Sequence, residues 1–282
     1  MTATSPRPLL EGRRLLITGV VTTDSIAYAT AEAVLAHGGA IVLSGLGRDL
    51  VRTRAAAEQL GPDIEVLEAD LTVPADLERL RHDLRARWGG VDGALHAVAF
   101  APREALAGDF LAAGAEAVAR AFHTSTQTNA ALAALVADLA PERGASIVGL
   151  DFDAAGAWPV YNWMGVCKAG LEAVNRYVAR DLGPRRIRSN LIAAGPIHTR
   201  AASGIAEFER LTEAWAAGSP MAWDPDDARP VADAACFLLS DLASMVTGEI
   251  LHVDGGYHAM AAPLAPATTP SAPATPRQPV PA

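Results

Sequence analysis

The chain has 282 residues, of which 50% are hydrophobic, and its formal net charge is −9. This length and apolar content suffice for one large α/β domain or two small ones. The acidic balance, with Lys and Arg residues scattered along the chain, argues against a nucleic-acid or anionic-membrane partner.

The two cysteines, Cys167 and Cys236, both lie in apolar helical contexts. We expect buried small hydrophobic side chains rather than a disulfide or a metal site, because no CxxC or HExxH spacing is present. The N-terminus lacks a charged head followed by an apolar core, which argues against a signal peptide. No apolar run reaches the length of a membrane span, so we expect a cytoplasmic protein. Because the metal-binding spacings are missing, we also expect no metal site.

Strands and helices alternate along the chain. Buried strands are predicted over 14–19, 40–44, 64–70, 91–100, 145–149, 187–194 and 249–253. Helices are predicted over 25–37, 48–60, 75–88, 112–139, from 161 onward, 205–215 and 231–239. This alternation is typical of βαβ units, and it predicts a Rossmann-like α/β fold with a doubly wound, seven-stranded parallel sheet in a single domain. Ligands of such a fold bind at the carboxyl ends of the strands.

Composition sets the expected limits of the domain. We assign residues 1–8 to an N-terminal arm and residues 9–260 to the Rossmann-fold domain. Residues 261–282 are rich in Pro, Ala and Thr, and such a segment buries too little apolar area to offset its ordering entropy. We therefore expect a disordered tail, with a partner-binding role as the alternative.

Tyr161 and Lys168 follow a predicted strand and a Trp158-Pro159 turn. On a helix, positions seven residues apart differ by about 20° and share one face. A phenol and an ammonium group would then point together from one helix, just beyond the end of a strand. This arrangement suits the polarisation of a carbonyl beside a cofactor.

The loop from Gly19 through Val21 to Ser25 and Ile26 opens the first predicted helix. Gly19 permits a tight turn, and the helix N-terminus offers free N–H groups and a positive dipole end to a pyrophosphate. Ser25 adds a hydroxyl group. The usual G-x-G-x-x-G pattern is absent, so an ordinary turn capped by Asp24 or Ser25 is the alternative.

The adenine end of a dinucleotide would lie beyond the second and third strands. The second strand ends without the acidic residue that commonly binds the ribose, and Leu46 is placed to pack on the adenine. Arg48 either meets a 2′-phosphate or is an ordinary surface charge. Asp70 and Leu71 lie where the adenine would be contacted, although Asp70 equally suits a helix cap.

Four motifs together resemble the enoyl-acyl-carrier-protein reductases, a divergent branch of the short-chain dehydrogenase/reductase superfamily. They are Gly19-x5-Ser25-Ile26-Ala27, Tyr161-x6-Lys168, the run NLIAAGPI at 190–197, and Asp254-Gly255-Gly256. The stretches YNWMGVCKAGLEAVNRYVAR and RSNLIAAGPIHT are similar to the mycobacterial, NADH-dependent type. The resemblance covers about residues 9–260. Common ketoreductases use Tyr-x3-Lys, and no tyrosine here has a lysine four residues later.

The resemblance implies hydride transfer from NADH to the β-carbon of a trans-2-enoyl thioester in fatty-acid biosynthesis. Tyr161 would hydrogen-bond the thioester carbonyl, and Lys168 would bind the nicotinamide ribose. Phe152 would lie beside the reacting double bond, or else is a core residue. Met164 would line the acyl pocket, whereas Trp163 is expected to pack against other side chains.

Backbone contacts to the cofactor are implied for Val98, Ala99, Gly195 and Ile197, with Thr199 near the pyrophosphate. The Gly195-Pro196 turn is equally compatible with an ordinary chain reversal. The family uses carrier-protein or coenzyme A thioesters and assembles as homotetramers.

Three features depart from the family. Ala97 replaces a serine of close relatives and Ala99 a glycine, and both changes are expected to weaken cofactor binding. The substrate-covering segment 200–220 is shorter than in the long-chain mycobacterial enzymes, which predicts shorter acyl substrates. The alternatives are another oxidoreductase of the short-chain dehydrogenase/reductase type and an inactive nucleotide-binding paralogue.

Overall fold

The computed structural model describes residues 8–261. The predictions for the N-terminal arm and the C-terminal tail therefore lie, except for Pro8 and Ala261, outside the described residues. Seven parallel strands form one sheet in the order β3-β2-β1-β4-β5-β6-β7. The strands are β1 (Arg14–Thr18), β2 (Ala40–Gly45), β3 (Glu65–Glu68), β4 (Gly93–His96), β5 (Ala145–Asp151), β6 (Ile187–Ala194) and β7 (Ile250–Val253). The predicted doubly wound α/β fold is thus confirmed.

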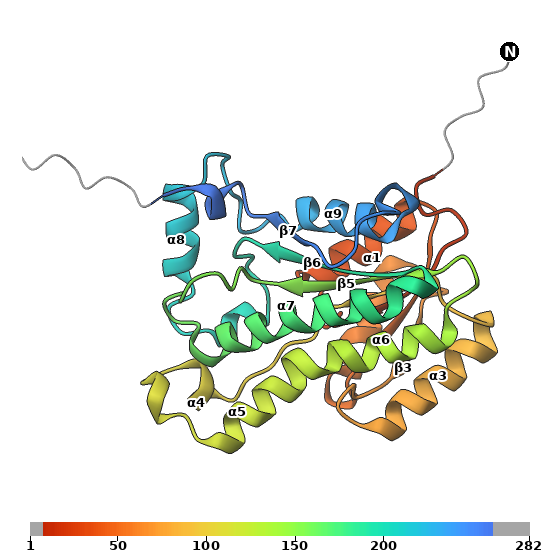
Figure 1. Ribbon diagram of the computed structural model, residues 1–282, viewed down its shortest axis with the longest axis horizontal. Coiled ribbons are helices and arrows are strands. Elements are labelled where there is room, and N and C mark those ends of the chain that lie inside the picture. The colour runs from red at the N-terminus through yellow and green to blue at the C-terminus, as the bar shows by residue number, and fades with distance from the viewer. Residues whose placement is uncertain (1–7, 262–282) are drawn as a thin grey trace, which may run out of the picture.

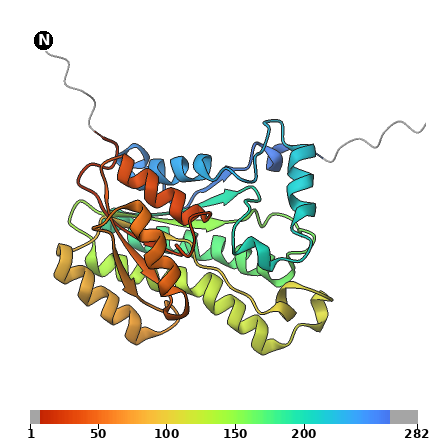
Figure 2. The same cartoon turned by 180° about the vertical axis from the view of Figure 1, so that it is seen from behind.

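Helices cover both faces of the sheet. One layer holds α1 (Ile26–Ala36), α2 (Leu50–Leu60) and α9 (Arg229–Leu239). The other holds α3 (Pro74–Trp88), α6 (Thr128–Leu139) and α7 (Asn162–Leu182), which lie in front of the sheet in Figure 1. In the view from behind (Figure 2), α1 and α2 lie in front of the sheet. The central strands are almost wholly buried because both faces are covered, which explains their uninterrupted apolar runs.

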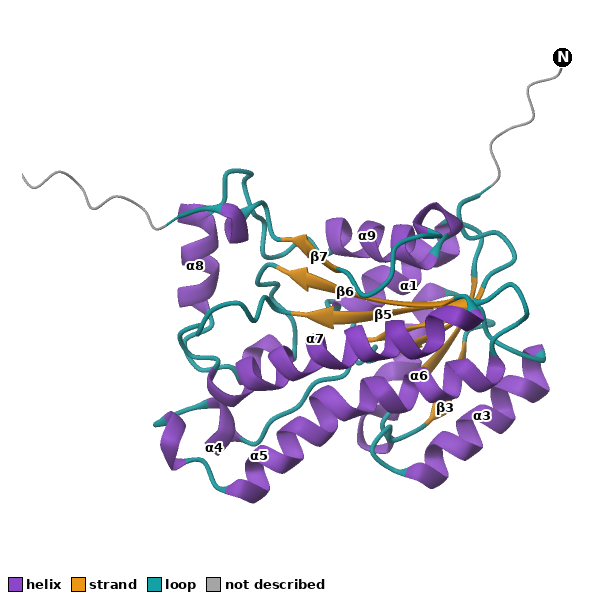
Figure 3. Ribbon diagram, viewed as in Figure 1, coloured by secondary structure: helices purple, strands orange, loops and turns teal. Residues whose placement is uncertain are grey.

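The strand order reverses between β1 and β4, because β2 and β3 extend the sheet on one side of β1 and β4 to β7 extend it on the other. In a parallel sheet all carboxyl ends meet at one edge. The arrowheads of β5, β6 and β7 point toward α8 (Glu209–Gly218) in Figure 3. The segment 200–220, which is predicted to cover the substrate, thus lies beyond the carboxyl edge of the sheet, where the ligand site is predicted.

The long helix predicted over 112–139 is confirmed from Ala115 to Leu139, and it contains a π-helical turn. It consists of α5 (Ala115–Phe122), the π-helical turn (His123–Gln127) and α6. Hydroxyl groups in the turn bond to the backbone of other segments: Ser125 Oγ donates to Phe100 O and accepts from Phe100 N, and Thr126 Oγ1 donates to Cys167 O. These tertiary contacts favour the local change from α- to π-helical hydrogen bonding.

The fourth strand is also shorter than the predicted 91–100. Strand pairing ends at His96 because Ala97 N and Phe100 N bond to the side-chain hydroxyls of Thr18 and Ser125 rather than to the backbone of a neighbouring strand. In the segment 200–220, α8 begins at Glu209 instead of the predicted residue 205, after Glu207 adopts a positive φ of 56°. A short helix, α4 (Arg103–Leu106), follows the loop after β4.

Both cysteines are buried and free, as predicted. Among residues 8–261, no helix has the length and hydropathy needed to cross a membrane.

Candidate functional site

The carboxyl edge of the sheet brings the predicted site residues together from six strands. Gly19 follows β1, Leu46 follows β2, and Asp70 and Leu71 follow β3. Further along the edge, Val98 and Ala99 follow β4, Phe152 follows β5, and Gly195, Ile197 and Thr199 follow β6. Tyr161 directly precedes α7, and Met164 and Lys168 belong to its first two turns. The sequence therefore predicts a set of residues that the fold does collect at one edge.

Gly19 lies against the backbone that leaves β4. Its φ is +84°, and a Cβ placed there would be 2.0 Å from the carbonyl oxygen of Ala97. Thr18 holds the two strand ends together, since its hydroxyl donates to Leu95 O at 2.8 Å and accepts from Ala97 N at 3.2 Å. Only glycine fits at position 19, and the loop after β1 can therefore turn tightly at the point where the strand order reverses.

The N-terminus of α1 opens directly from this loop. Ser25 is its N-cap: the hydroxyl accepts from Tyr28 N at 3.1 Å and donates to Thr22 O at 2.8 Å. The amides of Ile26 and Ala27 have no hydrogen-bond partner within residues 8–261. Capping and anion binding are therefore compatible here, because the cap leaves two N–H groups of the first turn available.

At the adenine end, Asp70 is not a helix cap. Its Oδ1 accepts from Thr72 N at 2.9 Å in a local turn, and Val73 is the N-cap residue of α3. Leu46 is partly exposed, and Arg48 is largely exposed and 3.5 Å from the carboxylate of Asp49. The structure therefore agrees with a surface role for Arg48.

Sequence reasoning gave Phe100 no role at this end of the site. The guanidinium carbons of Arg48 and Arg120 lie 5.9 and 5.0 Å from its ring centroid. No local pattern could signal this contact, because Arg120 belongs to α5.

Tyr161 lies one residue before α7 and is its N-cap, so the expectation of a tyrosine inside the helix is wrong. Both neighbours have left-handed backbone, with φ of 58° at Val160 and 40° at Asn162. Such conformations are strained for residues other than glycine, and they concentrate at functional sites. Asn162 is held by Nδ2 donating to Gly108 O at 3.1 Å. This geometry turns the phenol inward, where Tyr161 is 8% exposed.

Burial raises the pKa of the Tyr161 phenol well above its ordinary value, and the nearby carboxyl of Asp151 adds to the shift. The hydroxyl therefore stays protonated and able to donate. It makes no hydrogen bond to any residue that the structure describes, so it is free to bind a ligand.

Lys168 is buried within α7 and donates from Nζ to the carbonyl of Leu150 at 2.7 Å. Burial lowers the pKa of this ammonium group, and Asp151 opposes the shift. Burial in turn raises the pKa of Asp151 to about 7, while Lys168 lowers it. Neither carboxylate oxygen of Asp151 has a hydrogen-bond partner within residues 8–261. Sequence reasoning missed Asp151, although it directly precedes Phe152.

His96 is a second buried group that sequence reasoning left without a role. Its Nε2 lies 2.8 Å from Thr128 Oγ1, and that hydroxyl donates to Thr124 O, so Nε2–H is assigned as the donor. Burial, together with the smaller effect of the Lys168 charge, lowers the pKa of His96 to about 3. His96 is therefore neutral at physiological pH, and its other ring nitrogen has no partner among the described residues.

Phe152 contacts Tyr161 directly, with ring centroids 4.9 Å apart, and Met164 is buried in the same apolar cluster. Trp158, Trp215 and Tyr257 complete a set of adjoining rings. Trp163 instead stacks on Phe110 at 4.7 Å, which agrees with the predicted packing role.

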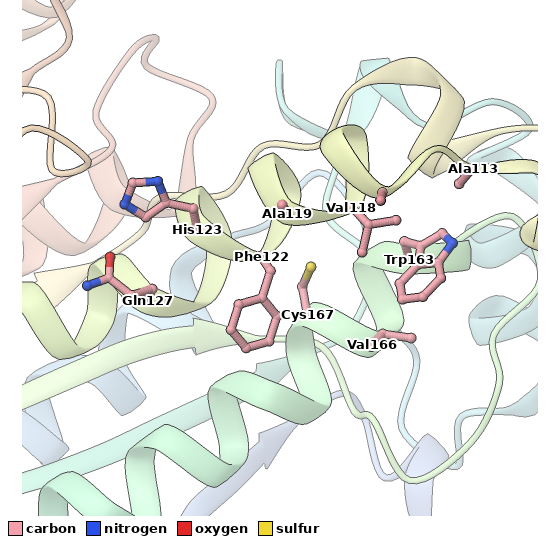
Figure 4. Close-up of a pocket in the computed structure, with 10 residues that line it drawn as sticks. Ala113, Val118, Ala119, Phe122, His123, Gln127, Trp163, Val166 and Cys167 are labelled. Atoms are coloured by element: carbon pink, nitrogen blue, oxygen red, sulfur yellow. The ribbon is translucent and has the colours of Figure 1, made fainter.

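Two apolar cavities lie between the α5–α6 segment and α7, away from Tyr161. The larger has a volume of about 700 Å³, and Figure 4 shows its lining, which includes Val118, Phe122, Trp163 and Val166. The second, of about 510 Å³, is lined by residues that include Phe122 and Tyr177. Within residues 8–261, no group of three or more His, Cys, Asp or Glu side chains is arranged to hold a metal ion.

Comparisons with known proteins agree with this geometry. Residues 19–258 match the protein-family model described as "Enoyl-(Acyl carrier protein) reductase". The chain is 38% identical to the enoyl-acyl-carrier-protein reductase (NADH) of Mycolicibacterium smegmatis, over 88% of this chain and 97% of that protein. It is 41% identical to the Neisseria meningitidis protein of that name, over 88% and 95% of the two chains. The Escherichia coli protein is 37% identical, over 88% and 95%.

Proposed function

Because the chain belongs to the enoyl-(acyl carrier protein) reductase family, we propose that it is an NADH-dependent enoyl-acyl-carrier-protein reductase of fatty-acid biosynthesis. One observation carries this proposal. The phenol of Tyr161 and the ammonium group of Lys168 are both buried at the carboxyl edge of the sheet, with Phe152 in contact with Tyr161. An unbonded, protonated phenol and a buried cation at the same edge of the sheet are suited to stabilising negative charge on a carbonyl oxygen.

The residues at the carboxyl edge fit NADH. The free amides of Ile26 and Ala27 would bind the pyrophosphate, and the glycine at position 19 leaves the close approach that a Cβ would block. Lys168 uses one of its three N–H groups on Leu150 O, so two remain for the nicotinamide ribose hydroxyls. The remaining residues proposed to contact the cofactor are Val21, Ser25, Leu46, Asp70, Leu71, Val98, Ala99, Gly195, Ile197 and Thr199.

NADH, when bound, supplies a hydride for the β-carbon of a trans-2-enoyl thioester, and a proton added at the α-carbon completes the saturated thioester. The chain's own contribution is to the carbonyl oxygen, on which negative charge develops as an enolate forms. Tyr161 donates its hydroxyl hydrogen to that oxygen, and the bond strengthens as charge grows, which lowers the barrier selectively. Lys168 adds a fixed positive charge in a site from which water is largely excluded.

Phe152 and Met164 are proposed to contact the acyl group, which arrives as a carrier-protein or coenzyme A thioester. The proposal places the protein in the cytoplasm, where fatty-acid synthesis supplies such thioesters. It also includes a homotetramer. Support comes from the apolar surface formed by α5, the π-helical turn and α7, where Phe122, Val166 and Tyr177 are 42%, 41% and 60% exposed.

Replacing Tyr161 by phenylalanine tests the proposal. We expect wild-type protein to oxidise NADH with crotonyl thioester, and Tyr161→Phe to lower kcat/KM by about 10²–10³-fold, the usual cost of losing one oxyanion donor. The NADH dissociation constant should be unchanged, because the lost hydroxyl serves the substrate. Tyr177→Phe, which removes a hydroxyl from an exposed ring, is the matched control and should match the wild type.

Two outcomes would contradict the proposal. Tight NADH binding without oxidation by any enoyl thioester would indicate a nucleotide-binding paralogue without activity. Oxidation only with other carbonyl or conjugated acceptors would indicate a different reductase of the same fold.

A further inference from the structure

Tyr161 and four other aromatic side chains form one contiguous cluster. Phe152 lies 4.9 Å from Tyr161, 5.4 Å from Trp158 and 5.5 Å from Trp215, measured between ring centroids. Trp215 and Tyr257 are stacked at 3.9 Å with an interplanar angle of 11°. Trp158 closes the set, at 5.0 Å from Trp215 and 5.8 Å from Tyr257.

Three separate segments supply the outer rings of this cluster. Trp158 belongs to the turn between β5 and α7, Trp215 to α8, and Tyr257 to the turn after β7. The packing between α8 and the last turn is close, because a Cβ at Gly218 would lie 2.7 Å from Tyr257 Cε2. Trp215 is only 2% exposed. The rings therefore form a wall that no single segment could build.

We propose that Trp158, Trp215 and Tyr257 form the end wall of the acyl pocket and restrict the enzyme to short-chain 2-enoyl thioesters. This inference rests on the proposed function. If the carbonyl oxygen binds Tyr161 and the double bond lies beside Phe152, carbons beyond the double bond meet Trp158 and Trp215. Ring centroids 4–6 Å apart are in packing contact and leave no channel for a methylene chain.

An unpaired donor places this wall next to the reacting centre. Trp215 Nε1 is buried and has no hydrogen-bond partner within residues 8–261, and it lies 2.9 Å from where a Cβ of Gly195 would be. Gly195 belongs to the turn after β6 that is proposed to meet the nicotinamide. The neighbouring Trp223 differs, because its Nε1 donates to Pro196 O at 2.9 Å. Trp215 therefore lies between the cofactor side of the site, at Gly195, and the ring of Tyr257 on which it stacks.

A longer acyl chain would have to separate the Trp215–Tyr257 stack and lose the contacts of both rings. Each methylene that finds no apolar pocket also forgoes roughly a fourfold gain in kcat/KM. Chain length should therefore be set by these side chains as well as by the length of the segment that covers the site.

The test compares kcat/KM for trans-2-enoyl thioesters with four, eight and twelve carbons. Trp158→Leu and Tyr257→Ala are the informative variants, because both side chains are only partly buried, whereas truncation of Trp215 risks unfolding. We expect the wild type to prefer the four-carbon substrate. For each variant, the ratio of kcat/KM with the twelve-carbon substrate to kcat/KM with the four-carbon substrate should rise at least about tenfold. Trp88→Phe, at the end of α3, is the control and should keep the wild-type profile.

The proposal is overturned if the active wild type prefers the twelve-carbon substrate, or if active variants and the control share one profile. The chain-length profile of the wild type can contradict the proposal by itself, so the proposal remains testable even if a variant fails to fold. Failure of the proposed function looks different: the wild type would oxidise NADH with none of the three thioesters, and the inference would fall with it.

Discussion

Lys168, Asp151 and His96 are ionisable side chains that the fold has removed from water near the ends of β4 and β5. Burial lowers the pKa of both basic groups and raises the pKa of the acid. The consequences differ. His96 is neutral at physiological pH, whereas Lys168 has a carboxyl neighbour that favours its charged form. The site therefore keeps one cation near Tyr161 rather than two.

The buried imidazole of His96 predicts an acid-sensitive stability. Its pKa is about 3 in the folded chain against an ordinary 6.5, so between these values the unfolded chain binds a proton that the folded chain does not. The free energy of unfolding therefore falls as pH drops below 6.5, by about 2 kcal/mol from this group near pH 5. We expect His96→Gln to lose about 2 kcal/mol less than the wild type between pH 7 and pH 5 in urea unfolding.

His82→Gln is the matched control for this prediction, because His82 is exposed on α3 and should leave the pH dependence as in the wild type. Equal losses for the wild type and His96→Gln would show that the imidazole does not carry the acid sensitivity.

At the scale of elements, the sheet edge at the carboxyl ends of the strands differs in its contacts from the edge at their amino ends. The carboxyl edge ends in loops that leave backbone groups available, as at the start of α1. The opposite edge is held by Asp92, which is 1% exposed and precedes β4. Its Oδ2 accepts from Arg14 N at 2.9 Å and Arg14 Nε at 3.1 Å, and its Oδ1 accepts from Arg143 Nε at 3.1 Å. This carboxylate ties β1, β4 and the loop before β5 together.

Asp92→Asn should therefore destabilise the protein without affecting catalysis. Charge-assisted hydrogen bonds to a buried carboxylate are lost, at a cost of about 2–3 kcal/mol in the free energy of unfolding. The KM values should not change, because the residue lies at the edge remote from the site. Asp138→Asn is the control, since the Asp138 side chain is 53% exposed and its ion pair with Arg81 contributes at most about 1 kcal/mol. Equal stabilities of the two variants in urea would contradict this role of Asp92.

For the whole molecule, one surface without an assigned role is the apolar face between the α5–α6 segment and α7. It carries exposed Phe122, Val166 and Tyr177 and both cavities, on a chain whose net charge is −9. Contiguous apolar area of this kind is typical of subunit interfaces. A homotetramer would cover it.

Val166→Glu should then lower the oligomeric state, because it introduces a charge that burial at an interface would desolvate. Light scattering after size exclusion is expected to give four times the 29.3 kDa chain mass for the wild type and a smaller species for the variant. Val51→Glu is the control, since Val51 is an 81% exposed valine on α2. A monomeric wild type, or a Val166→Glu variant of unchanged mass, would rule this interface out.

The amino-acid sequence by itself determined the architecture, and it predicted several residues of the candidate site. Alternating apolar runs predict the seven parallel strands because strand and helix periodicities are local properties, and Gly19, Tyr161 and Lys168 follow from positions beside those runs. The roles of these residues remain predictions for the enzyme assays.

Only the tertiary structure decided how segments distant in the sequence meet. It introduced a π-helical turn into the helix predicted over 112–139, where hydroxyl groups contact other segments, and it placed Asp151 and His96 near Lys168. It also joined Trp158, Trp215 and Tyr257 into one wall. None of these contacts has a local signature, because burial and ring packing depend on strand order and on helix placement, which bring residues together regardless of their separation along the chain.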